Sequence, residues 1–338
     1  MNILITSAGA VAQEPPAAGA DGEGADAPWF DPAGHLGRRG WKYFSPATRY
    51  LLAAGNRALG RRHDDPPLTG RPSLRLGVVT GTQYAIAHVH RRMDGILRTE
   101  GVRGISPAEV PGFSMSTPGS QLAITAGARA FSVTLTNPVT AGLEAVHFAV
   151  TALRTGRADR VVAAATDRAP TGDGRGGQYD AAAAVVLSAA APDVAGPATA
   201  LAGITGGLSR FVPRGIDGSW DPAALLVTGR RLAALADGPA GTDGVRVVVS
   251  APAGAAEFGA AVLDAVGAAR GPVRAPDGAL VEARHCSVSG MLELIALARS
   301  GGPALLISVS ESGHLTAIAL DGPARTRFHK TSEKHIPQ

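Results

Sequence analysis

The sequence contains one cysteine, Cys286, so no disulfide can form within the chain and no cysteine-rich zinc site is available. Aromatic residues make up only 4% of the 338 residues, and charged residues 18%. No stretch approaches the roughly 18 consecutive apolar residues that a membrane-spanning helix needs. The first eleven residues, MNILITSAGAV, lack the basic lead of a signal peptide and resemble a buried strand. We therefore expect a soluble, cytoplasmic protein that does not bind membranes.

Positive charge is in slight excess but is not concentrated in one segment. The net charge is +4, and pairs of adjacent arginines are spaced along the chain at Arg38-Arg39, Arg61-Arg62 and Arg91-Arg92. A nucleic-acid-binding protein usually has a basic stripe interleaved with aromatic residues, so this distribution argues against nucleic acid as a partner. The early arginines could help to dock an acidic carrier protein, although the solubility of a surface helix explains them more simply.

Hydrophobic residues make up 45% of the chain, enough for a sizeable core. Strand-like and helix-like patterns alternate in both halves, which predicts an α/β protein with covered, mostly parallel sheets. The predicted strands cover residues 1–11, 74–80, 131–136, 160–165, 181–189, 245–250, 304–310 and 315–320. The predicted helices cover residues 46–59, 85–100, 121–126, 141–155, 222–235, 256–269 and 289–299. We divide the chain into an N-terminal half (1–170), a shortened C-terminal half (171–325) and a polar tail (326–338).

The order of motifs in the first half resembles that of the β-ketoacyl synthases. The segments that carry the resemblance are FDPAGHLGRRGWKYFSPATRYLLAAGNRAL, LGVVTGT, ISPAEVPGFSMSTPGSQLAI and ARAFSVTLTNPVTAGLEAVHFAVTALRTGRADRVVAAATD. The second half matches more weakly, through QYDAAAAVVLS, RVVVSAPAG, HCSVSGMLELIALARSG and ISVSESGHLTAIAL. The resemblance implies the thiolase-like, five-layered αβαβα fold, in which two similar halves stack helices between and outside two sheets.

The resemblance also shows which catalytic groups are missing. A condensing ketosynthase holds its acyl chain on a cysteine at a helix N-terminus and uses two histidines to stabilise developing negative charge. Aligning Ala141-Gly142-Leu143 with the family's Ser-Gly-Leu places Val139 at the cysteine position. The histidine positions fall on Pro252 and Arg284, and the family's lysine falls near Ala279. All four polar functions are lost together, so we expect no condensing activity.

Among ketosynthase-like proteins, chain-length factors of type II polyketide systems share this loss of the nucleophile. The resemblance therefore implies a non-catalytic subunit that pairs with an active ketosynthase in a heterodimer and shapes the acyl tunnel of a polyketide or polyene synthase. No bound cofactor or metal is expected. The acyl chain would arrive through the partner, linked to the phosphopantetheine of an acyl carrier protein.

The same resemblance assigns candidate interface and tunnel residues. Residues 131–136 would pair across the dimer axis, with Phe131, Val133 and Leu135 as interface candidates, since an unpaired edge strand is a hazard in a monomer. Residues 109–121 would lie near the partner's tunnel, where Phe113 and Met115 are bulky enough to limit an acyl chain. Ordinary core packing would account for these two side chains equally well.

Two other functions remain open. His285 and Cys286 are the only adjacent base and nucleophile, and a thiolase-fold acyltransferase, hydrolase or cyclase could use them. Adjacent strand residues point to opposite faces, and a lone cysteine is most often a small buried hydrophobe, which argues against this pair. The third possibility is a pseudo-enzyme that only scaffolds a complex.

Overall fold

The computed structural model describes residues 2–15, 29–107, 112–170, 177–189, 200–236, 245–270 and 279–322. The described strands are β1 (Ile3–Ala12), β2 (Leu76–Gly81), β3 (Phe131–Leu135), β4 (Arg160–Asp167), β5 (Ala181–Ala189), β6 (Ala202–Phe211), β7 (Arg246–Ala251), β8 (Leu280–Glu282), β9 (Ala304–Val309) and β10 (His314–Asp321). The described α-helices are α1 (Pro32–Leu36), α2 (Pro46–Leu59), α3 (Gly70–Leu74), α4 (Ala87–Glu100), α5 (Thr117–Ala126), α6 (Ala141–Arg154), α7 (Pro222–Ala236), α8 (Ala256–Arg270) and α9 (Ser289–Ser300). Short 3-10 helices are η1 (Val102–Gly104), η3 (Ala253–Ala255) and η4 (Cys286–Val288).

The two halves of the chain repeat one strand order. The first half-sheet runs β3-β2-β4-β5-β1 and the second runs β8-β7-β9-β10-β6. In each, three strands are parallel and the last two are antiparallel to their neighbours. A short antiparallel pairing of β1 with β6 joins the half-sheets into one ten-stranded sheet. Strand β5 follows residue 170 in the sequence but pairs with β4 and β1 in the first half-sheet. The strand pairing therefore divides the two repeats between β5 and β6.

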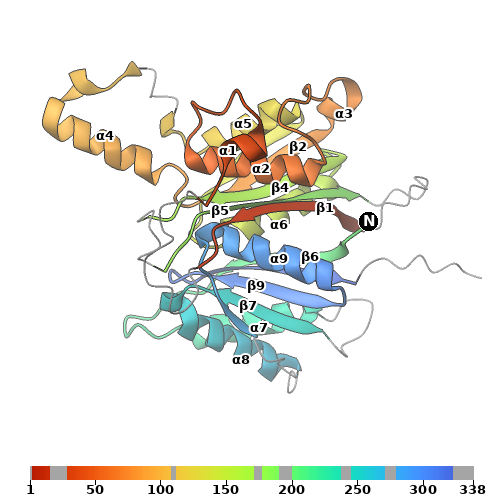
Figure 1. Cartoon of the computed structure of the whole chain (residues 1–338). Coiled ribbons are helices and arrows are strands. Elements are labelled where there is room, and N and C mark those ends of the chain that lie inside the picture. The colour runs from red at the N-terminus through yellow and green to blue at the C-terminus, as the bar shows by residue number, and fades with distance from the viewer. Residues whose placement is uncertain are drawn as a thin grey trace, which may run out of the picture.

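The layers follow from which apolar faces are buried (Figure 1). Helices α2 and α5 cover the outer face of the first half-sheet. Helices α6 and α9 lie between the half-sheets and contribute to one core with strands from both. Helices α7 and α8 cover the outer face of the second half-sheet. The predicted αβαβα arrangement of two similar halves is confirmed. No helix in the described part of the chain is long and apolar enough to cross a membrane.

Strand β6 had no counterpart in the sequence prediction. Its sequence, AGITGGLSRF, contains three glycines, which are depleted in strands. The structure gives two of them a packing reason. A Cβ on Gly206 would lie 2.5 Å from Leu235, and one on Gly207 would lie 2.6 Å from His147. The glycines make this segment unlike a strand in sequence, and two of them also allow α7 and α6 to pack closely against it.

Candidate functional site

A strained turn precedes α6, the buried helix of the first half. The turn follows β3 and holds Val139 at a φ of 64°, where a β-branched residue is a genuine outlier. Two backbone hydrogen bonds close the turn: Thr140 N donates to Pro138 O at 2.7 Å, and Ala141 N donates to Asn137 O at 3.2 Å. Such strain costs about 1–3 kcal/mol and persists only where the surroundings enforce it. The geometry is that of a nucleophile elbow, and the residue at its apex is a buried valine.

The backbone N–H of the elbow is already occupied. Val139 N donates a hydrogen bond to Gln83 Oε1 at 3.1 Å. Elbow N–H groups are the donors that hold the carbonyl oxygen of an acyl substrate as negative charge develops on it. The carboxamide oxygen of Gln83 therefore takes the place that such a carbonyl oxygen would need. The sequence analysis missed Gln83, because nothing local in the sequence joins residue 83 to residue 139.

A buried carboxylate supports the elbow from within its own helix. Asn137 Nδ2 donates to both oxygens of Glu144, at 2.9 and 2.8 Å, and Thr140 Oγ1 donates to Oε1 at 2.9 Å. Glu144 lies in the first turn of α6 and is buried. The polar groups around Val139 are thus engaged in fixing the turn.

A second buried carboxylate ties the two halves together. Asp167, at the end of β4, is fully buried. Its Oδ1 accepts hydrogen bonds from Thr82 Oγ1, Gln83 N and Tyr84 N, at 3.0, 2.8 and 2.5 Å. Its Oδ2 accepts from Ser287 N and Ser287 Oγ, at 3.0 and 2.5 Å. Burial raises the pKa of the Asp167 carboxyl above its ordinary value, and the hydrogen bonds from Ser287, Tyr84 and Gln83 oppose that rise.

The second half has a corresponding elbow in front of α9. Cys286 has a φ of 49° and lies at the start of η4, which leads into α9. In the repeated strand order, β8 and α9 correspond to β3 and α6, so Cys286 is the counterpart of Val139. Val139 and Cys286 are the only residues other than glycine with positive φ in the described part of the chain. The strain is therefore a feature of the fold, repeated in both halves.

Comparison with known proteins gives the family of this chain. The family described as "Beta-ketoacyl synthase, N-terminal domain" matches residues 18–190, which is just over half of the chain. The chain belongs to the β-ketoacyl synthase family. No curated protein gives a significant match to its sequence.

Solved ketosynthase structures share the fold over almost the whole chain. The ishigamide ketosynthase/chain length factor superposes with a TM-score of 0.70 at 19% identity, covering 96% of this chain and 100% of that one. A type II polyketide acyl-carrier protein in complex with its ketosynthase bound to the hexaketide (AntDE:AntF) gives 0.71 at 16% identity, covering 95% and 99%. The oxazolomycin ketosynthase domain of Streptomyces albus JA3453 gives 0.65 at 17% identity, covering 96% of each chain.

The positions predicted to replace the ketosynthase histidines carry structural contacts. Pro252 is buried, follows β7 and precedes η3. Arg284 is half-exposed and pairs with Glu282, with Nη2 2.6 Å from Oε2. Ala279 is buried, and its carbonyl accepts a hydrogen bond from Val249 N at 2.6 Å. The side chains of Pro252 and Ala279 cannot stabilise an enolate as an imidazole would. Arg284 carries a positive charge, but its guanidinium is paired with the Glu282 carboxylate.

His285 and Cys286 have separate partners. The His285 ring donates from Nε2 to Gln13 O at 2.9 Å, and Cys286 Sγ donates to Gln178 Oε1 at 3.3 Å. Burial lowers the pKa of His285, while burial and the nearby Asp167 raise the pKa of the Cys286 thiol. At neutral pH the imidazole is therefore neutral and the thiol protonated, which is opposite to the activated state of a nucleophilic cysteine.

We expect Cys286 to be unreactive in the folded protein. Because its pKa is raised, the thiol stays protonated through neutral and mildly alkaline pH, and its buried position blocks reagents. Titration with a chromogenic disulfide should release almost no thiolate colour from the native chain and one equivalent after unfolding in urea. Rapid modification of the native chain would instead restore Cys286 as a candidate nucleophile.

A mostly apolar hollow adjoins the segment that holds the predicted tunnel residues, but neither Phe113 nor Met115 lines it. It has a volume of about 540 Å³ and lies between the starts of α2 and α5 and the helix α4, with Phe44, Ile86, Val89 and Met93 in its lining. Met115 packs against a small core that includes Ile86. The Phe113 ring stacks on His90, with centroids 6.0 Å apart. Residues 109–111 of the predicted tunnel segment lie outside the described residues.

Strand β3 forms one edge of the sheet, as predicted for the dimer strand. It pairs with β2, and no described strand pairs with its other edge. Phe131, Val133 and Leu135 pack against the core around α6, so these side chains face inward. A partner chain that lies along the outer edge of β3 would therefore contact its backbone N–H and C=O groups rather than these three side chains.

Proposed function

We propose that this chain is a non-catalytic, chain-length-factor-like subunit that pairs with an active ketosynthase of a type II polyketide or polyene synthase. The observation that carries the proposal is the elbow of α6. The fold keeps the strained backbone at Val139, yet a valine replaces the nucleophile and Gln83 occupies its N–H. A site built in this way can support the architecture of a ketosynthase but cannot hold an acyl thioester.

Two surface features support a dimer with such a partner. The edge of β3 has unpaired backbone groups among the described strands, and an open edge of this kind favours pairing with another chain. Helix α4 projects from the rest of the chain (Figure 1), and Met93 is its only buried residue. A subunit resting on β3 and α4 would cover both features.

The hollow beside α4 is the part of this chain that we assign to the acyl tunnel. Most of its surface is apolar, although His88, Arg92 and Gln121 also line it, and it could receive a growing carbon chain that the partner holds as a thioester delivered by the phosphopantetheine of an acyl carrier protein. Phe113 follows the lining residue Gly112, and Met115 packs near the lining residue Ile86, so we expect these two side chains to set how far the chain can extend.

The proposal is tested by co-expression with the ketosynthase encoded beside it, followed by size exclusion with mass determination. We expect a stable one-to-one complex in which an acyl carrier protein loads acyl groups covalently on the partner alone. A homodimer that ignores the ketosynthase would contradict the proposal. Acyl loading on this chain, abolished by Cys286→Ala, would instead favour an enzyme with unconventional residues.

A second measurement separates tunnel shaping from scaffolding. Met115→Ala and Phe113→Ala should each lengthen the product of the complex, because removing bulk deepens the tunnel. The matched control is Phe211→Ala, which removes an aromatic side chain that is 52% exposed on β6 and does not line the hollow. Unchanged product length in all three variants would leave only a scaffolding role.

A further inference from the structure

A charged hollow lies in the outer helical layer of the first half. It has a volume of about 810 Å³ and is formed where the end of α1 and the following loop meet the loop after α2. Among the described residues, its lining contains four arginines and one acid, Asp64. We call residues 33–40 and 61–64 the arginine pocket.

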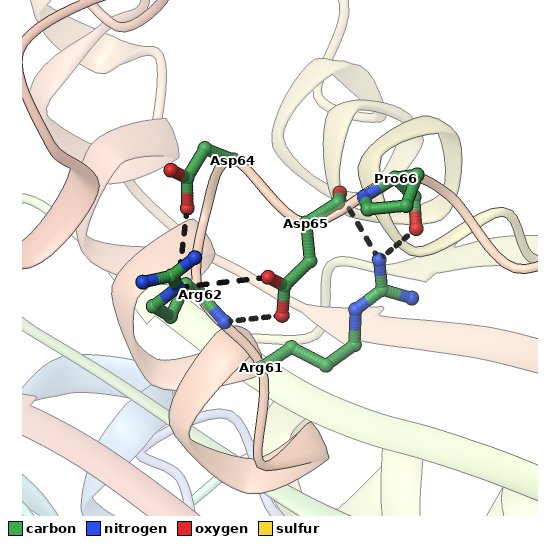
Figure 2. Close-up of polar contacts among 5 residues, drawn as sticks. All are labelled: Arg61, Arg62, Asp64, Asp65 and Pro66. Atoms are coloured by element: carbon green, nitrogen blue, oxygen red, sulfur yellow. Dashed lines mark hydrogen bonds and ion pairs between the residues drawn. The ribbon is translucent and has the colours of Figure 1, made fainter.

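One of these arginines is held rigidly without losing its charge (Figure 2). The Arg61 guanidinium donates to the backbone carbonyls of Asp65, at 3.2 Å, and Pro66. It also donates to the carbonyl of Ala126, at 3.3 Å. Carbonyl oxygens are neutral acceptors, so the positive charge of Arg61 is fixed in place but not neutralised.

The neighbouring Arg62 is only partly compensated. Its Nε lies 3.5 Å from an oxygen of Asp64 and 3.6 Å from one of Asp65 (Figure 2), and its side chain is exposed. Exposed ion pairs at such distances are weak and exchange readily with other anions.

The opposite wall supplies guanidinium groups that have no partner among the described residues. Arg38 and Arg39 lie between Gly37 and Gly40, whose φ angles of 72° and 88° form a tight loop. Both arginines are exposed, and neither makes a hydrogen bond or ion pair with any described residue. The pocket therefore combines a fixed cation with two uncommitted guanidinium groups.

We propose that the arginine pocket binds a small molecule that carries two or more phosphate charges. Planar guanidinium forks match phosphate oxygens in pairs, and the exposed Arg38, Arg39 and Arg62 all line this concave surface. The pocket lies beyond the end of α2, whose 14 residues span about 20 Å. The start of α2 contacts β4 near the elbow, where Thr166 Oγ1 donates to Ala47 O. The proposed site is thus separate from the elbow and does not depend on the proposed function.

The test uses inorganic pyrophosphate as the probe, with the full chain and isothermal titration calorimetry at about 0.15 M salt. We expect saturable binding with a dissociation constant below about 1 mM. The double variant Arg38→Ala/Arg39→Ala should weaken binding by about tenfold or more, because it removes charge-assisted hydrogen bonds. The matched control is Arg230→Ala/Arg231→Ala, an exposed arginine pair on α7, which should change binding by less than about twofold.

Several outcomes would overturn the proposal. One is the absence of saturable pyrophosphate binding, and another is an equal loss in the two double variants, which would indicate general surface attraction. A third is that an acidic carrier protein, but not pyrophosphate, binds through Arg38 and Arg39, which would make the surface a protein-docking site. Inorganic phosphate is the second probe. If the pocket contacts two phosphate groups at once, the affinity for inorganic phosphate should be lower than that for pyrophosphate.

Discussion

Installing a cysteine at the elbow is expected to restore acyl uptake, and to do so much faster when Gln83 is also removed. In Val139→Cys the new thiol would sit at a helix N-terminus, but the N–H beside it would still donate to the Gln83 carboxamide. In Val139→Cys/Gln83→Ala that N–H becomes available to the oxygen of a thioester. Because one such donor contributes about 10²–10³ to acyl-transfer rates, we expect acylation of the double variant to be at least tenfold faster. Intact-mass measurement with an acyl thioester, followed by peptide mapping, gives the rates and the site.

A second reagent distinguishes carbonyl binding from simple access. Alkylation by iodoacetamide displaces iodide and develops no oxyanion, so it does not need the Val139 N–H. If Gln83 acts by occupying the carbonyl site, removing it should accelerate acylation much more than alkylation. An equal rise in both reactions would mean that Gln83 only restricts access, and no rise in either would contradict its assigned position.

The contrast between Val139 and Gln83 shows how far the sequence could go. Helix 141–155 and strand 131–136 were predicted from periodicity, and the family resemblance placed Val139 between them. Periodicity is a local pattern and the resemblance is an ordered set of motifs, so both can be recognised in a single sequence. The contact of Gln83 with Val139 spans 56 positions, and those of Asp167 with Gln83 and Ser287 span 84 and 120. No local rule relates residues so far apart, so the occupied N–H and the buried carboxylate appear only once the chain is folded.

The same reasoning explains the arginines. Their pairing in sequence suggested a solvated helix face or a docking surface, and both readings treated Arg61 and Arg62 alike. In the structure Arg61 is tied to carbonyls from its own loop and from the end of α5, while Arg62 faces solvent. The difference depends on how the loop after α2 turns back toward α5, which charge patterning does not specify.

Replacing Asp167 is expected to be the most damaging single change in the described part of the chain. Asp167→Ala would leave the buried N–H of Ser287 and the partly buried N–H groups of Gln83 and Tyr84 without their acceptor, at about 1–3 kcal/mol for each unsatisfied group. We therefore expect the free energy of unfolding to fall by at least about 3 kcal/mol, measured by urea denaturation. Asp167→Asn should also destabilise strongly, because its amide NH₂ would face donors and could accept from none of them.

The matched control is Asp159→Ala, which removes a carboxylate from an exposed pair. Asp159 lies 2.8 Å from Arg75 Nη2 at the other end of β4, with its side chain 53% exposed. Exposed pairs contribute about 0–1 kcal/mol, so this variant should stay close to the parent. Similar small losses in both variants would mean that the hydrogen bonds to Asp167 do not hold the halves together. A large loss confined to Asp167 would indicate that the loop carrying Gln83 and the segment carrying Cys286 are stabilised as one unit, since a single carboxylate bonds to both.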